Sequence, residues 1–111
     1  MEYAASLRGT PLVPAATGSV TLTKTSSGWR IHLTAAGLPR LDNGNYYEGW
    51  LENSTGDLVP IGTFNQATDV ILWAGVRPSG YPTITITRHQ TSGGPASPGQ
   101  RVLTGLSHRI D

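Results

Sequence analysis

Glycine and proline interrupt this chain so often that long helices do not fit between them. The sequence has 14 Gly and 8 Pro among 111 residues. No segment keeps apolar residues at the i, i+3, i+4, i+7 spacing of an amphipathic helix over three turns. Apolar and polar residues instead alternate with period two, in segments rich in β-branched and aromatic types. The sequence therefore predicts an all-β protein made of short antiparallel strands.

The alternation marks eight short segments as strands, and it is cleanest around Trp29, Ile31 and Leu33. Turn-forming clusters separate these segments, and two of them, Ser26–Gly28 and Ser54–Asp57, are short enough to close hairpins. Two packed antiparallel sheets, a β-sandwich of about seven to eight strands, is the predicted fold, with a small closed barrel as the alternative. The predicted strands are Ala4–Arg8, Ser19–Thr25, Trp29–Ala35, Tyr46–Asn53, Leu58–Phe64, Asp69–Ala74, Thr83–His89 and Arg101–Gly105.

The length and the absence of cysteine bound the organisation of the chain. A chain of 111 residues suits one domain, here 1–111 with a core at about 4–105 and a C-terminal tail at 106–111. A domain of this size folds without metal or disulfide staples. No cysteine is present, so disulfides and thiolate metal sites are excluded. No apolar run reaches the roughly 18 residues of a membrane span.

The charged residues give no sign of a nucleic-acid partner. The net charge is +1, and the eight basic residues, seven of them Arg, are scattered singly along the chain. Nucleic-acid binding needs a concentrated basic surface, and membrane attraction needs a polybasic cluster. We therefore expect neither nucleic-acid binding nor direct membrane attachment through charge.

Metal and cofactor motifs are also missing from the sequence. The three histidines, His32, His89 and His108, have no spacing that would place two of them on one strand face or helix face. A blue-copper site would require a cysteine ligand. Neither phosphate-loop nor dinucleotide glycine patterns occur. We predict no metal and no cofactor.

One pair of carboxylates invites a catalytic hypothesis. Glu48 and Glu52 lie on the same face of a predicted strand and flank Trp50. Their Cα atoms would stand about 13 Å apart, whereas the carboxyl groups of glycosidases are about 5–9.5 Å apart. No Gly-x-Ser-x-Gly elbow supports a serine nucleophile. We expect no enzyme, and a small hydrolase using Glu48 or Glu52 is the least favoured alternative.

The aromatic residues concentrate in Tyr46–Phe64, which the sequence predicts to be a central hairpin. Both faces of its first strand carry bulky residues, as expected of a strand covered on both sides. The favoured interpretation is that its aromatics fill the core, together with Trp29 and Trp73. The alternative is a sugar-stacking face formed by Tyr46, Glu48 and Trp50, which share one strand phase.

Several segments in order resemble a known family. Tyr47-Glu48-Gly49-Trp50-Leu51 followed by Gly62-Thr63-Phe64 is similar to a Tyr-Glu-x-Trp-Leu strand and a Gly-Thr-Phe strand end in the extracytoplasmic C-terminal domains of bacterial anti-sigma factors of the anti-sigma-K type. Gly37-Leu38-Pro39 upstream and Gly93-Gly94-Pro95 downstream are similar too, and the resemblance covers roughly residues 15–105. One departure is Thr87-Arg88-His89-Gln90, where the family often has an acidic residue and Pro.

The resemblance implies a sensor or regulatory domain rather than a catalyst. Tyr47, Glu48, Trp50, Leu51, Gly62, Thr63 and Phe64 would be mainly structural. The domain would be a fragment of a longer membrane protein, on the outer side of a bacterial cell membrane. The sigma factor would be held by an N-terminal domain absent from this chain. A missing transmembrane helix would anchor the full-length protein in the membrane. Regulated proteolysis would release the sigma factor, so partners would include a protease or an envelope protein. The alternative function is a secreted carbohydrate or cell-wall binding module.

Overall fold

The protein consists of eight β-strands in a computed structural model that describes residues 1–90 and 99–110. All eight predicted strands are confirmed, with boundaries shifted by a few residues. The predicted loop at Ser92–Pro95 lies outside the described residues. The strands are β1 (Glu2–Gly9), β2 (Thr17–Thr25), β3 (Gly28–Ala36), β4 (Tyr46–Glu52), β5 (Leu58–Phe64), β6 (Val70–Ala74), β7 (Thr83–His89) and β8 (Gln100–Arg109).

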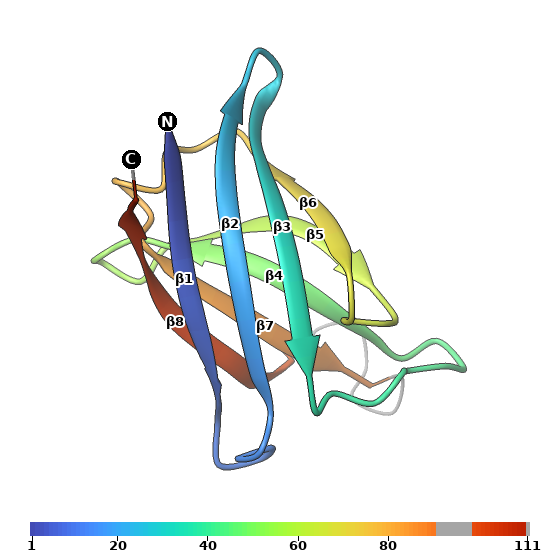
Figure 1. The fold of residues 1–111 in the computed structure, drawn as a ribbon. Coiled ribbons are helices and arrows are strands. Elements are labelled where there is room, and N and C mark those ends of the chain that lie inside the picture. Colours follow the sequence, from blue (N-terminus) through green and yellow to red (C-terminus); the bar gives the residue numbers. More distant parts are fainter. Residues whose placement is uncertain (91–98, 111) are drawn as a thin grey trace.

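The strands form one continuous antiparallel sheet in the order β5-β4-β7-β8-β1-β2-β3-β6. The two edge strands of this order, β5 and β6, contact each other, so the sheet curls until its edges meet (Figure 1). The all-β prediction is confirmed, but the two predicted sheets are a single, nearly closed one. The reason is the long antiparallel pairing of β1 with β8, which joins the two halves by hydrogen bonds.

The C-terminal strand is longer than the sequence predicted. The expected strand ended at Gly105, with a tail from residue 106, but β8 continues to Arg109. Tyr3 of β1 pairs with Arg109, and Ala4 pairs with His108. Residues 106–109 are therefore part of the sheet rather than a tail, and both ends of the chain lie side by side (Figure 1). Few of these residues are apolar, which hid the strand from a pattern based on hydrophobicity.

The core occupies the single interior of the curled sheet. Trp29 is buried there, as predicted, and Tyr3 meets it edge-to-face with ring centroids 5.6 Å apart. Aliphatic side chains from every strand complete this core, among them Leu7, Leu22, Ile31, Leu33, Leu51, Ile61, Leu72, Ile84, Ile86 and Leu103. A curled sheet has one interior, so only one of the two side-chain phases of each strand points into it.

Two glycines let the edges of the sheet approach each other. Gly49 of β4 pairs with Gly62 of β5, beside a bulge in the β4–β5 ladder. A Cβ on Gly49 would lie 2.9 Å from Ile61 Cγ1, and one on Gly62 would lie 2.8 Å from Leu72 Cδ2. Leu72 belongs to β6, so the glycine pair makes room for the opposite edge strand. Gly62 also has a φ of 139°, which side-chain-bearing residues rarely adopt.

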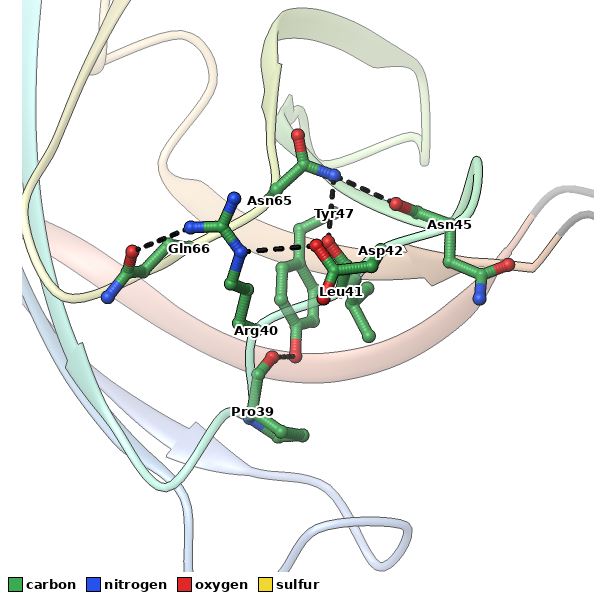
Figure 2. Close-up of polar contacts among 8 residues, drawn as sticks. All are labelled: Pro39, Arg40, Leu41, Asp42, Asn45, Tyr47, Asn65 and Gln66. Carbon is green, nitrogen blue, oxygen red and sulfur yellow. Dashed lines mark hydrogen bonds and ion pairs between the residues drawn. The ribbon is translucent and has the colours of Figure 1, made fainter.

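Two connections close one end of the gap between β5 and β6. The β3–β4 connection, residues 37–45, is tied to the β5–β6 connection: Leu41 N–H donates to the Asn65 carbonyl at 3.0 Å, and the Asn65 side chain donates back to the Leu41 and Asn45 carbonyls (Figure 2). Arg40 adds hydrogen bonds to Asp42 and Gln66. These contacts hold the β3–β4 connection against the residues that follow β5.

The hydroxyl of Tyr47 holds the β3–β4 connection, residues 37–45, from the interior of the sheet. Tyr47 is completely buried, and its hydroxyl donates to the Pro39 carbonyl at 2.6 Å (Figure 2). Its ring stacks against Phe64 with centroids 5.6 Å apart. Burial raises the pKa of the Tyr47 phenol above its ordinary value of 10.0, and the positive charge of Arg88 opposes part of that rise. Tyr47 and Phe64, both in the family-like motif, thus pack in the core and against it, respectively.

Candidate functional site

The two phases of β4 face different surroundings. Tyr47, Gly49 and Leu51 are buried in the interior, whereas Tyr46, Glu48 and Trp50 lie on the outer face. The prediction that the hairpin aromatics fill the core is therefore wrong for Tyr46 and Trp50. It is also wrong for Trp73 of β6, whose surface is 48% exposed. Among residues 1–90 and 99–110 no second layer covers the outer face of β4, because the strand belongs to a curled sheet with a single interior.

Trp50 is fixed on the outer face by a hydrogen bond to the neighbouring strand. Its indole N–H donates to Thr87 Oγ1 at 2.9 Å. Thr87 is itself buried, and its hydroxyl lies 3.4 Å from the Glu48 carbonyl and 2.9 Å from Nε2 of His89. The Thr87 hydroxyl therefore joins Trp50 and His89 in one polar network, although the two are 39 residues apart.

His89 occupies the ring face of Tyr46. The two residues are cross-strand partners, and their rings stack with centroids 4.8 Å apart and an interplanar angle of 3°. His89 Nε2 also lies 3.4 Å from Glu48 Oε1. Gly99 lies against the imidazole, since a Cβ there would be 2.7 Å from Nε2. The predicted ligand face of Tyr46, Glu48 and Trp50 is thus occupied by neighbours from β7: His89 contacts Tyr46 and Glu48, and Thr87 contacts Trp50.

The two carboxylates of β4 contact different partners. Glu48 faces His89, while Glu52 Oε1 lies 3.3 Å from the Arg101 guanidinium of β8. The strand places both on the outer face, as the sequence predicted. Each has its own partner, and nothing in this arrangement brings them together as an acid–base pair.

A cavity of about 280 Å³ opens on this outer face. It lies across four neighbouring strands and is lined by Trp50, Leu58, Thr85, Thr87, Gly99 and Arg101. Thr85 is only 1% exposed, and among the described residues its Oγ1 has no hydrogen-bond partner. The sequence pattern singles out Trp50 but does not indicate the other residues of the cavity lining. The Thr-x-Thr-x-Thr alternation of residues 83–87 indicates only which threonines face outward, not which strands lie beside them.

A second cavity of about 280 Å³ gathers basic side chains that are far apart in the sequence. Lys24, Arg77 and Arg109 line it, together with the aromatic rings of Tyr3 and Trp29. Lys24 Nζ lies 5.9 Å from the centroid of the Trp29 ring, within reach of a cation–π interaction. The basic residues are scattered in the sequence, as described, but the fold brings these three to one place.

The described residues also bear on metal binding and on membrane spanning. Among residues 1–90 and 99–110, no group of three or more His, Asp or Glu side chains is arranged to hold a metal ion. Within the same residues no helix has the length and apolarity needed to cross a membrane.

Comparison with known proteins gives one match. The family model described as "Anti-sigma-K factor rskA, C-terminal" matches residues 1–102. No curated protein and no solved structure matches the chain significantly. The match covers nearly the whole sheet, from β1 into β8, and includes both outer-face carboxylates, Trp50 and the Gly49–Gly62 pair.

Proposed function

Because the chain belongs to the family of anti-sigma-K factor C-terminal domains, we propose that it is the extracytoplasmic regulatory domain of a membrane-anchored anti-sigma factor. The family assignment makes it an anti-sigma factor domain, and sigma-factor regulation is the activity that assignment implies. The match to residues 1–102 is the observation on which this proposal depends. The location outside the cell, the sensing role and control by proteolysis are proposed with it.

The topology suggests how such a domain would take part in regulated proteolysis. β1 lies inside the sheet, paired with both β2 and β8. A protease that reads its substrate as an extended strand cannot engage β1 while both ladders are formed. We therefore propose that β1 is not the cleavage site while the domain is folded, and that partners act by exposing a site elsewhere in the full-length protein. The sigma factor itself would be bound by another part of the full-length protein.

We propose no catalytic role for the domain. Glu48 and Glu52, the only carboxylates that sequence analysis considered for catalysis, face His89 and Arg101 respectively. Each carboxylate thus contacts a different side chain, and the two are not arranged as an acid–base pair. The hydrolase hypothesis predicts an activity that Glu48→Gln would abolish, and the proposal expects none to be measured.

The test follows the native protein in its own cells. An antibody against this domain should detect a membrane-fraction band heavier than 11.8 kDa that protease added outside intact cells removes. The isolated domain should not capture the sigma factor, whereas the full-length protein should. A soluble exported band near 11.8 kDa would contradict the proposal and favour the secreted binding module.

A further inference from the structure

We propose that the cavity beside Trp50 binds a single neutral sugar ring. The site is formed by Trp50 of β4, Leu58 of β5, Thr85 and Thr87 of β7, and Arg101 of β8. These residues lie on four strands that are consecutive neighbours in the sheet, so the sheet fixes their relative positions. This inference is separate from sigma-factor control and stands or fails on ligand binding alone.

The size of the cavity limits the ligand to a small molecule. Its volume of about 280 Å³ lies just below the range of about 300–1,000 Å³ usual for drug-sized ligands. One pyranose ring is smaller than such ligands, and any further rings of an oligosaccharide would extend into solvent. The cavity therefore matches one ring rather than a buried oligosaccharide.

Trp50 supplies an aromatic wall whose position is already fixed. Its indole N–H is bound to Thr87 Oγ1 at 2.9 Å, so the ring is positioned before a ligand arrives. A preorganised side chain loses little conformational entropy on binding. Leu58 is an exposed apolar residue of the same lining. Together they offer apolar surface to the C–H face of a sugar ring.

The buried hydroxyl of Thr85 provides the polar reason for a ligand. Its Oγ1 is inaccessible to solvent and has no partner among the described residues. Buried polar groups are almost always hydrogen-bonded, and leaving one unpaired destabilises a fold. Thr87, two residues along the same strand face, has its hydroxyl fully engaged. Thr85 lines the cavity, so a small rotation of its side chain would bring the one unpaired hydroxyl of the lining to a ligand hydroxyl.

The charges of the site favour a neutral ligand over an anion. Arg101 brings one positive charge to the lining, but Glu52 lies 3.3 Å from its guanidinium and offsets that charge. An anion would compete with Glu52 for Arg101. The guanidinium has five N–H donors, so one can stay with Glu52 while others face a sugar hydroxyl. A donor and an acceptor side by side suit a vicinal diol, which both gives and accepts hydrogen bonds.

The test is a titration of the domain followed by NMR of its indole N–H groups. Glucose, N-acetylglucosamine and galactose are the probes, and Trp50→Phe assigns the Trp50 signal among the three tryptophans. We expect a dissociation constant of about 1 mM for at least one probe, because a ligand of this size makes few contacts. The Trp50 signal should shift, while the signals of Trp29 and Trp73 stay in place.

Two matched variants separate binding from folding. Thr85→Val keeps the shape of the side chain and removes the unpaired hydroxyl, so affinity should fall about five- to tenfold while the melting temperature does not fall. Thr83→Val changes a threonine of the same strand outside the cavity lining and should leave affinity unchanged.

Three results would overturn the proposal. They are a Trp50 signal that stays fixed with every probe, a Thr85→Val variant that binds as well as the parent chain, and tighter binding of glucuronate than of glucose. The last result would assign the site to anions and contradict the neutral class. None of these results bears on whether the full-length protein regulates a sigma factor.

Discussion

The two faces of β4 show how one strand serves two purposes. On the inner face, Tyr47 and Leu51 are completely buried, and Gly49 leaves space for Ile61 and Leu72. On the outer face, bulky polar and aromatic residues contact side chains of the neighbouring strand β7 instead of a second layer. Inner-face positions are constrained by volume, because the interior is densely packed. Outer-face positions are constrained by hydrogen bonds and ring contacts.

This difference explains the composition of the family-like motif. Tyr47, Leu51, Gly62 and Phe64 belong to the core or to the junction of the sheet edges. Glu48 and Trp50 belong to the outer network with His89 and Thr87. A motif that looked like one packing unit in the sequence therefore combines two sets of contacts. Substitutions on the two faces should have different consequences.

The largest effect is expected at the junction of the sheet edges. Gly62→Ala places a Cβ 2.8 Å from Leu72 Cδ2 and imposes a side chain on a residue with φ 139°. Overpacking and backbone strain together should lower the unfolding free energy by about 3 kcal/mol. Urea unfolding of the parent chain and of Gly62→Ala measures this difference in unfolding free energy.

The double variant with Leu72→Ala tests the cause of that loss. If the clash with Leu72 dominates, Gly62→Ala should cost less in the Leu72→Ala background than in the parent chain. Equal costs in both backgrounds would attribute the loss to the backbone alone. A stable Gly62→Ala protein would remove volume as the main constraint on the inner face.

On the outer face, neighbouring threonines should respond in opposite directions. Thr87→Val removes the acceptor of the Trp50 indole N–H and should lower the unfolding free energy by about 1–2 kcal/mol. Thr85→Val replaces an unpaired buried hydroxyl and should be neutral or stabilising. Thermal unfolding of both variants measures the contrast. Similar losses would mean that side-chain volume, not hydrogen bonding, governs the outer face as well.

Tyr47 links the inner face to the connection at residues 37–45. Tyr47→Phe removes the hydrogen bond to the Pro39 carbonyl and should cost about 1 kcal/mol. Tyr46→Phe, on the outer face, is the matched control and should cost less, because ring stacking on His89 does not need the hydroxyl.

The raised pKa of Tyr47 adds a pH dependence to the same pair. Above pH 10.0 the unfolded phenol ionises while the buried one keeps its proton. The folded state then binds more protons, so stability present below pH 10.0 is lost as the pH rises through the folded pKa. Chemical unfolding at increasing pH measures this slope. Tyr47→Phe should flatten this slope.

The sequence predicted the strands because alternation is a local property. Trp29, Ile31 and Leu33 lie on the inner face of β3, as their spacing indicated. The turn at Ser26 and Ser27 was also predictable, since a two-residue loop fixes the pairing of the strands beside it. Local chemistry could not predict that β1 pairs with β8, which joins residues more than a hundred positions apart and makes one sheet out of two.

The candidate site depends on the same long-range pairing. Trp50 was recognisable from its phase, but its neighbours Thr87 and Arg101 reach it only through the β4-β7-β8 order. Bulky residues on both phases of Tyr46–Asn53 were interpreted as coverage by a second layer. Cross-strand contacts cover that face instead: Tyr46 by His89, and Trp50 by Thr87. Composition alone does not distinguish the two kinds of coverage.

The smallest effect is expected at the turn that joins β4 to β5. Asp57 accepts hydrogen bonds from the Asn53 side chain at 2.9 Å and from the Thr55 hydroxyl at 3.0 Å. These bonds, Asn53 first, hold the pKa of the Asp57 carboxyl below its ordinary value of 3.8. The stability they give is present above pH 3.8 and is lost as the pH falls through the folded pKa. NMR titration of the carboxyl should show the low pKa, and Asn53→Ala should return this pKa towards 3.8.

Because the turn is solvent-exposed, Asp57→Asn should alter acid unfolding only slightly and leave both faces of β4 unchanged. A large loss of stability would mean that the turn, rather than either face, determines the stability of the hairpin.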